Sequence, residues 1–325
     1  ANGVAFLHGG EVIATGGADA TLRLWNRQGK LLAAPAPVHE NFIRTVAASP
    51  HGDTVATGDA DGVLVLWDRE GRASVVRKAH RRELSSAAFS PDGRTIATTG
   101  ADRTLRFWDD TGELVRTIET GNAEVASLAF AVGGATLATA RTDGVVQLFD
   151  GEGTLVHTIA SEVPRLHGVA VAADGAIAVS GLDGAVRLWL PDGVLLDLEG
   201  HRGSVFSVAF SPDGETLATA GADGTVRLWN RRGNQIGPAM RTSGSTVASV
   251  AFSPDGAMIA TVSADGILAL WRAGNWRTWL EAACDRLRDH PVLQRPQKDA
   301  QREASERCGC GGDGEAVAPA SPATT

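Results

Sequence analysis

Apolar and polar side chains alternate with a period of two in three short stretches of residues 201–230. In the first stretch, residues 205, 207 and 209 alternate with Phe206, Val208 and Phe210, and residues 217–220 and 226–229 repeat the alternation. A period of two places successive side chains on opposite faces of an extended chain. The segment therefore predicts three consecutive β-strands.

Tight turns separate these stretches. The Ser-Pro-Asp-Gly sequence at Ser211–Gly214 combines a proline that fixes φ, an aspartate that caps the turn and a glycine that accepts positive φ. Asp223-Gly224 is a second hairpin signal, and a third turn ends at Gly233. Apolar segments such as 114–118 and 155–159 follow the third turn in other copies. Each copy therefore predicts a four-stranded antiparallel meander.

The unit recurs along most of the chain. An aspartate in the second turn is followed six residues later by an aromatic residue, and these aromatics lie 40 to 42 residues apart. The pairs are Asp19/Trp25, Asp61/Trp67, Asp102/Trp108, Asp143/Phe149, Asp183/Trp189, Asp223/Trp229 and Asp265/Trp271. A fixed period of this length indicates a repeat architecture in which each unit buries its apolar face against its neighbours.

At these residues the chain resembles the WD40-repeat β-propellers, and the resemblance covers about residues 1–274. It implies an all-β, seven-bladed ring of four-stranded antiparallel blades. In this family a histidine, a hydroxyl residue, the turn aspartate and the tryptophan form one hydrogen-bonded set in a blade. Three complete sets are expected, namely His39/Thr57/Asp61/Trp67, His80/Thr98/Asp102/Trp108 and His201/Thr219/Asp223/Trp229.

Other units lack members of the set. The fourth has Gly121 in place of the histidine and Phe149 in place of the tryptophan, and Phe149 cannot donate the indole hydrogen bond. The fifth has Glu162 and Val179, and the seventh has Ser243. We expect these blades to be held more loosely.

The same residue types could suggest a catalytic triad, but the set recurs in several units whereas a catalytic site occurs once. The alternative that we keep is a propeller hydrolase, similar to lactonases or esterases, with its site at the mouth of the channel. The turn aspartates are engaged in structure, and the sequence has no Gly-rich phosphate loop, HExxH or GxSxG motif. We therefore predict a chain that is not an enzyme and needs no cofactor or metal.

Composition narrows the class of partner. The formal net charge of −8 and the absence of a basic stripe argue against nucleic acid. No apolar run approaches the ~18 residues of a membrane span. The three cysteines, Cys284, Cys308 and Cys310, lie after the repeats, which indicates a reducing, cytoplasmic location. With His290 they could suggest a metal site, but there is no second close pair of ligands, so inert thiols are expected, with a redox pair as the alternative.

The two ends of the sequence suggest a piece of a longer protein. Residue 1 aligns with Val205, inside a first strand, so the first blade is expected to be truncated at its N-terminal side. After Trp271, apolar residues at helical spacing predict a helix within 275–293 packed on the propeller, with a strand at 275–280 as the alternative. If it is a helix, the seventh blade would lack its outer strand and leave an open edge. The tail 294–325 is expected to be disordered.

The segment 279–296 also resembles the tail that follows the propeller of large bacterial signalling proteins with a STAND-type NTPase, a protease-like domain or a kinase. We expect a protein–protein interaction scaffold or sensor module, whose partner could include effector domains of the same protein. Candidate binding residues lie in the loops that lead into the innermost strands, where aromatic and arginine residues dominate binding energy. They are Phe42, Arg44, Arg81, Glu83, Arg165 and Arg202.

Overall fold

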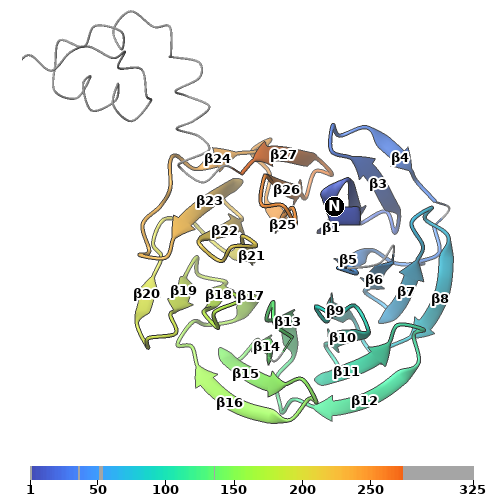
Figure 1. Ribbon diagram of the computed structural model, residues 1–325, viewed down its shortest axis with the longest axis horizontal. Helices are drawn as coiled ribbons and strands as arrows, with labels where there is room; N and C mark the ends of the chain where they lie inside the picture. The colour runs from blue at the N-terminus through green and yellow to red at the C-terminus, as the bar shows by residue number, and fades with distance from the viewer. Residues whose placement is uncertain (1, 36, 51–53, 135, 274–325) are drawn as a thin grey trace, which may run out of the picture. The chain divides into compact units, whose positions relative to one another are not determined.

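The computed structural model describes residues 2–35, 37–50, 54–134 and 136–273. These residues form seven antiparallel sheets arranged around a common centre (Figure 1). The predicted all-β propeller is therefore confirmed. The predicted helix at 275–293 and the tail 294–325 lie outside the described residues.

The strands follow one another in each blade, from the innermost to the outermost. The first blade comprises β1 (Gly3–Leu7), β2 (Val12–Gly16), β3 (Leu22–Asn26) and β4 (Leu31–Ala33), with the 3₁₀ turn η1 (His8–Gly10) after β1. The second comprises β5 (Ile43–Ala48), β6 (Val55–Asp59), β7 (Val63–Trp67) and β8 (Ala73–Lys78). The third comprises β9 (Leu84–Phe89), β10 (Thr95–Gly100), β11 (Thr104–Asp109) and β12 (Leu114–Glu119).

The remaining blades repeat this order. The fourth comprises β13 (Val125–Phe130), β14 (Thr136–Arg141), β15 (Val145–Asp150) and β16 (Leu155–Ala160). The fifth comprises β17 (Leu166–Val171), β18 (Ile177–Gly181), β19 (Val186–Trp189) and β20 (Leu195–Asp197). The sixth comprises β21 (Val205–Phe210), β22 (Thr216–Gly221), β23 (Thr225–Asn230) and β24 (Met240–Arg241). The seventh comprises β25 (Val247–Phe252), β26 (Met258–Ser263) and β27 (Leu268–Arg272).

Within the described residues the seventh sheet has three strands, and the other six sheets have four each. Residues 275–280, for which a fourth strand was the alternative to a helix, lie outside the described part of the chain. In the first blade β1 pairs with β2 along its whole length, from Gly3 opposite Gly16 to Leu7 opposite Val12. No helix in the described part of the chain is long and apolar enough to cross a membrane.

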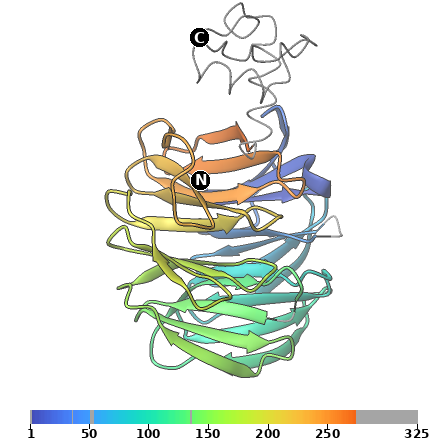
Figure 2. The same ribbon diagram turned by 60° about the vertical axis from the view of Figure 1, so that its left-hand side comes forward.

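The apolar core lies between neighbouring blades, because each sheet buries both of its faces. Between the third and fourth blades, Phe107 and Leu105 pack with Leu137 and Phe149. The first and seventh blades share a core of the same kind, in which Phe6 and Ile13 pack with Val262. Figure 2 shows the sheets following one another around the ring in a turned view. The period-two alternation supplies one apolar row to each of these junctions.

Hydroxyl side chains also join the innermost strands of consecutive blades. In the second to seventh blades the third residue of this strand is a serine, a threonine or a glycine, and Gly3, the first residue of β1, aligns with it in the first blade. In four of these blades its hydroxyl oxygen accepts a hydrogen bond from a backbone N–H of the next blade. These pairs are Thr45 with Ala87 at 3.2 Å, Ser86 with Leu128 at 3.3 Å, Ser127 with Val169 at 3.3 Å and Ser207 with Val250 at 3.2 Å. Gly3 and Gly168 occupy the same position in the first and fifth blades.

Candidate functional site

The third blade contains a complete hydrogen-bonded set that joins its first three strands. His80 lies in the loop before β9, Thr98 lies on β10, Asp102 lies in the turn after β10, and Trp108 lies on β11. The His80 Nδ1 lies 2.8 Å from the Asp102 Oδ1, and its Nε2 lies 2.8 Å from the Thr98 hydroxyl. The Trp108 indole N–H donates to the same hydroxyl oxygen at 2.8 Å. The set therefore has the bonding that the sequence predicts.

Burial and hydrogen bonds fix the protonation states of this set. Burial lowers the pKa of His80, against the opposing effect of Asp102. Burial by itself would raise the pKa of Asp102. Hydrogen bonds from the Arg81 amide, His80 and Thr104 outweigh it and lower that pKa to about 2. Asp102 is therefore an ionised acceptor, and the neutral His80 ring donates to it and accepts from Thr98.

The sixth blade repeats this geometry. His201 Nδ1 lies 3.1 Å from the Asp223 carboxylate, and its Nε2 lies 2.7 Å from the Thr219 hydroxyl. The Trp229 indole donates to Thr219 at 2.9 Å. Thr98 and Thr219 are both fully buried, so neither hydroxyl is accessible to a substrate. This arrangement suits a structural clasp and not a nucleophile.

In the second blade the expected role of Asp61 is wrong. His39 Nδ1 lies 2.7 Å from the Oδ2 of Asp59, whose Oδ1 accepts the amides of Asp61 and Val63 at 3.0 and 2.8 Å. Asp59 is 1 % exposed, whereas Asp61 lies at the surface, 3.3 Å from the Asn41 amide nitrogen. His39 Nε2 lies 2.6 Å from the Thr57 hydroxyl, to which Trp67 donates at 2.7 Å, as expected.

The reason is the residue at the end of the second strand. Asp59 stands where the third and sixth blades have Gly100 and Gly221. A Cβ placed on Gly100 would lie 2.8 Å from the His80 Nδ1, so this position directly adjoins the imidazole. A carboxylate carried there reaches the ring from closer range than the turn aspartate does. The sequence signal that could have identified Asp59 is an acidic residue at the position where the aligned third and sixth units have glycine.

The fourth blade leaves its central hydroxyl without partners. Thr139 is fully buried, and its Oγ1 has no hydrogen-bond partner among the described residues. Phe149 supplies no N–H, and Gly121 supplies no ring. A Cβ on Gly121 would lie 2.8 Å from the Arg141 Nη1, so the Arg141 guanidinium lies beside the backbone position where a histidine is expected. Arg141 donates to the Thr120 carbonyl at 2.7 Å and pairs with Asp143.

Incomplete sets in the other blades use local substitutes. In the fifth blade Arg187 lies 3.1 Å from Glu162 and 2.7 Å from Asp197. In the seventh, the Ser243 hydroxyl donates to Asp265, and Trp271 donates to Thr261 at 3.0 Å. Polar pairs therefore form where the histidine is missing, and the expectation that these blades are held more loosely stays a prediction.

The loops that lead into the innermost strands, which we call the leading loops, bring two candidate binding residues, Phe42 and Glu83, close to a third, Arg44, the second residue of β5. The Arg44 guanidinium forms an ion pair with Glu83 of the next blade, and it lies 5.4 Å from the centre of the Phe42 ring. We call Phe42, Arg44 and Glu83 the leading-loop cluster. It joins the second and third blades.

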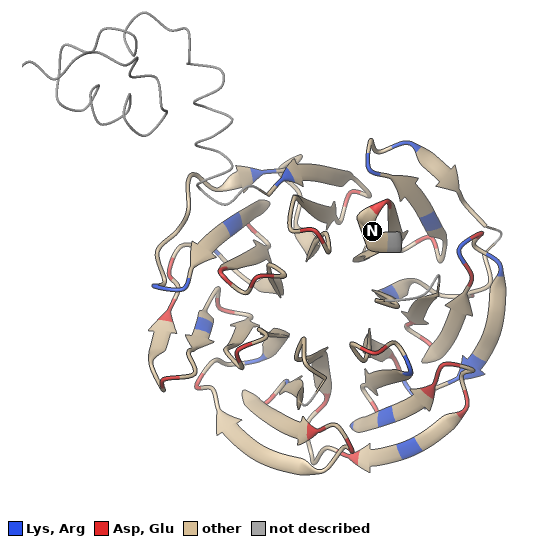
Figure 3. Cartoon of the chain, in the orientation of Figure 1, with Lys and Arg blue, Asp and Glu red and all other residues tan. Residues whose placement is uncertain are grey.

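The other three candidates, Arg81, Arg165 and Arg202, form no ion pair or hydrogen bond with this cluster within the described residues. The backbone amides of Arg81 and Arg202 donate to Asp102 and Asp223 at 3.0 and 3.1 Å, and both side chains are exposed. Arg165 is also exposed, and its φ is +50°. Figure 3 shows that acidic and basic residues are interspersed around the ring and form no basic stripe. Arg165 precedes β17 of the fifth blade and Arg202 precedes β21 of the sixth, so neither extends the leading-loop cluster of the second and third blades.

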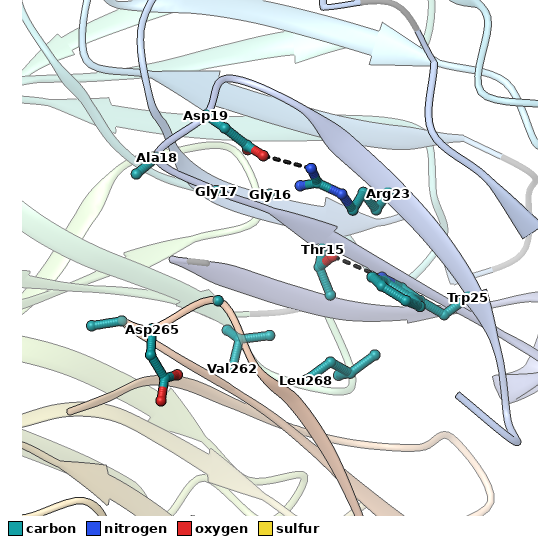
Figure 4. A pocket seen from close by; sticks show the side chains of 12 residues that line it. Thr15, Gly16, Gly17, Ala18, Asp19, Arg23, Trp25, Val262, Asp265 and Leu268 are labelled. Atoms are coloured by element: carbon teal, nitrogen blue, oxygen red, sulfur yellow. Dashed lines mark hydrogen bonds and ion pairs between the residues drawn. The ribbon is translucent and has the colours of Figure 1, made fainter. Parts of the chain in front are cut away.

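A hollow of about 310 Å³ lies between the first and seventh blades. Figure 4 shows Asp19 pointing toward Arg23 and Thr15 toward Trp25 on one wall, with Asp265 on the other. Arg23 lies 2.6 Å from Asp19, and its hydrogen bond lowers the pKa of that carboxyl. Hydrogen bonds from Ser243 and Ser263 likewise lower the pKa of Asp265. A general acid needs a raised pKa, so neither carboxyl suits that role.

Across the described residues, no group of three or more His, Cys, Asp or Glu side chains could hold a metal ion. Cys284, His290, Cys308 and Cys310 lie outside those residues, so the structure does not test the expectation of inert thiols there.

Comparison with known families gives one result. A family model described as WD domain, G-beta repeat (WD40) matches residues 1–26, 34–68, 73–109, 112–150, 193–230 and 238–272. The unmatched stretch between 150 and 193 contains the first three strands of the fifth blade, where Glu162 and Val179 replace the usual histidine and hydroxyl residue. The structure nevertheless forms a four-stranded sheet there. No curated protein matches the chain.

Proposed function

The chain belongs to the WD40 repeat family, and we propose that it is a non-catalytic scaffold that binds a protein partner through its leading loops. Propellers of this family commonly serve as interaction scaffolds. The seven-bladed ring supplies a rigid frame, and the loops at its face are available for contact. The site is proposed on the second and third blades.

The leading-loop cluster is the observation that supports this proposal best. Phe42 is half-buried, and the Arg44 side chain remains 44 % exposed although it contacts both Phe42 and Glu83. Aromatic and arginine side chains carry much of the binding energy at protein interfaces. Because the ion pair and the ring contact already restrict the Arg44 side chain, that side chain would lose less conformational entropy when a partner binds.

Two further features favour a protein partner over nucleic acid, membrane or substrate. The chain carries a formal net charge of −8, which disfavours a polyanion. The His–Thr–Asp clasps of the third and sixth blades are buried and repeated, which favours a structural role over catalysis. We also propose a cytoplasmic location, a proposal supported by the position of all three cysteines outside the repeats.

The test is the double substitution Phe42→Ala/Arg44→Ala. Partners are first identified by cross-linking in an extract of the source cells, and the affinity of each purified partner is then measured by calorimetry. We expect the double substitution to weaken binding at least tenfold. Arg94→Ala, in the exposed turn between β9 and β10, is the control and should leave the affinity unchanged. Equal affinity of the double variant and the unsubstituted protein for every partner would contradict the site.

We also propose that the module is the C-terminal part of a larger bacterial signalling or defence protein, in which it restrains or releases an effector domain. The resemblance of residues 279–296 to the tails of such proteins supports this proposal. The measurement is the activity of the effector domain with and without the propeller. Identical activities would contradict it.

A further inference from the structure

We propose that the third blade recognises a phosphorylated side chain on a protein partner, held between the guanidinium groups of Arg81 and Arg103. The inference rests on the proposed scaffold function and adds the chemical class of the partner. It depends on the shape of the blade surface, on the charges left unpaired there and on the backbone of Arg103.

Two adjoining hollows of about 360 and 470 Å³ lie at the loops of the third and fourth blades. Both are lined by Arg81, Asp102, Arg103 and Asn122. The side chains of Arg81, Arg103 and Asn122 are exposed. Their donors therefore face a shared concave surface that is open to a ligand.

The acidic residues of these hollows are mostly occupied. Asp102 accepts from His80 and Thr104 at 2.8 Å each and lies 3.3 Å from the Arg106 guanidinium. Glu124 lies 3.2 Å from Arg82. Among the lining acids, only Glu119 has no ion pair within the described residues.

The two proposed cations are not occupied in this way. The side chains of Arg81 and Arg103 make no ion pair and no hydrogen bond with any described residue. Two unpaired guanidinium groups therefore face one unpaired carboxylate, Glu119, across the hollows. A phosphate group carries close to two negative charges and three acceptor oxygens, so it can satisfy two arginines at once, whereas a carboxylate satisfies one.

The backbone of Arg103 is a separate observation. Its φ is +64°, in the left-handed region that favours glycine. The second, fourth, fifth, sixth and seventh blades carry a glycine with positive φ at the same position of the turn, namely Gly62, Gly144, Gly184, Gly224 and Gly266. The first blade carries Ala20 there with a φ of +58°, so the third blade is the one that places a long cationic side chain at this position of the described turns. The turn has a positive φ in every blade, so what distinguishes the third blade is the guanidinium group that this residue carries.

The surroundings favour a protein segment as the carrier of the phosphate. Arg81 lies two residues before Glu83, so the hollows adjoin the leading-loop cluster along the chain. A protein segment bound at the leading-loop cluster would therefore lie beside the loop that carries Arg81. The net charge of −8 opposes a continuous polyanion but does not prevent binding of one local phosphate.

The probe is a fluorescein-labelled peptide pool with phosphoserine at a fixed central position and random residues around it. Matched pools carry serine or glutamate at that position, and fluorescence anisotropy measures their binding to the full chain. We expect the phosphoserine pool to bind at least tenfold more tightly than the serine pool. Arg81→Gln and Arg103→Gly should each remove at least tenfold of that affinity.

Two controls accompany these variants. Arg94→Gln makes the same change of charge in the turn between β9 and β10, and it should leave binding unchanged. Arg103→Gly introduces the residue that other blades carry at this position, so the variant should fold, and its melting temperature checks that it does.

Three results would overturn the proposal. The first is equal binding of the phosphoserine and serine pools. The second is an equal loss of binding for Arg94→Gln and Arg103→Gly. The third is tighter binding of a single-stranded RNA oligonucleotide than of the phosphoserine pool, which would indicate a nucleic-acid site. A partner that requires Phe42 and Arg44, yet is insensitive to Arg103→Gly and to phosphatase treatment, would refute this inference and leave the scaffold proposal intact.

Discussion

The third and fourth blades are each built from four strands of six residues, yet their interiors are bonded differently. In the third, the buried Thr98 hydroxyl joins His80 and Trp108. In the fourth, the equally buried Thr139 has no partner within the described residues. The backbone ladders and the apolar core between blades are therefore sufficient to form the sheet. The polar set adds stability to a blade whose fold is already determined.

The largest effect is expected in the second blade, where the clasp uses an unexpected carboxylate. Asp59→Ala would leave His39 and two backbone amides without their buried acceptor, and removing one partner of such a pair costs about 3 kcal/mol. Asp61→Ala, at the surface, should cost less than about 1 kcal/mol. Urea denaturation measures both changes in the free energy of unfolding. A larger loss for Asp61→Ala would restore the turn aspartate as the partner of His39.

A matched pair of substitutions tests the comparison of the third and fourth blades directly. Thr98→Val removes the acceptor of Trp108 and the partner of His80, and we expect a loss of about 2 kcal/mol. Thr139→Val replaces a hydroxyl without partners by a methyl group of similar size, so the change should be zero or a gain of up to about 1 kcal/mol. Each substitution replaces one hydroxyl group by a methyl group, and the two positions are equivalent in their blades. Equal destabilisation in urea would mean that the hydrogen-bonded set contributes nothing measurable.

The pH dependence of stability should also reflect the complete set. The pKa of Asp102 in the folded protein is about 2, below the ordinary value of 3.8. A depressed pKa contributes stability above pH ~4, and this contribution is lost as the pH falls toward 2. Asp102→Asn should therefore be less stable than the unsubstituted protein at pH 7, and the gap should narrow at pH 2.5. A gap of constant size in urea titrations at both pH values would show that ionised Asp102 is not the source.

The smallest effect concerns the turn that distinguishes Arg103 from Gly144. Arg103→Gly relieves a positive φ, and we expect a gain of about 0.5 kcal/mol, since the greater freedom of glycine in the unfolded chain offsets part of the relief. The melting temperature should rise slightly. A fall would mean that the Arg103 side chain stabilises the folded blade.

Much of this architecture could be predicted from the sequence, because alternation, turn residues and a fixed period all indicate the same unit. The clasps of the third and sixth blades followed from residue identity, since His80 and His201 each have a glycine at the position that adjoins the ring. In the second blade the same reasoning failed, because Asp59 and Asp61 are both carboxylates within reach of the turn. Only the three-dimensional path of the strand end distinguishes them.

The candidate binding site was less predictable. The leading-loop cluster depends on Arg44 and Glu83, which lie on different blades and meet only when the ring packs them together. Arg103 could have been noticed from the sequence, because it interrupts a series of turn glycines. Its unpaired guanidinium could not, because pairing depends on the positions of Arg106, Glu119 and Glu124 around the hollows.

The hydroxyl bonds between innermost strands have a consequence for how the ring closes. A closed ring requires its seven angular steps to sum to one full turn, so an error in any step must be compensated in another. Where Thr45, Ser86, Ser127 and Ser207 bond the next blade, the length of a hydrogen bond sets the step. Gly3 and Gly168 set no such length, and their junctions rest on close packing against Val46 and Val208. We expect small angular errors from the other blades to be absorbed at junctions that lack such a hydrogen bond.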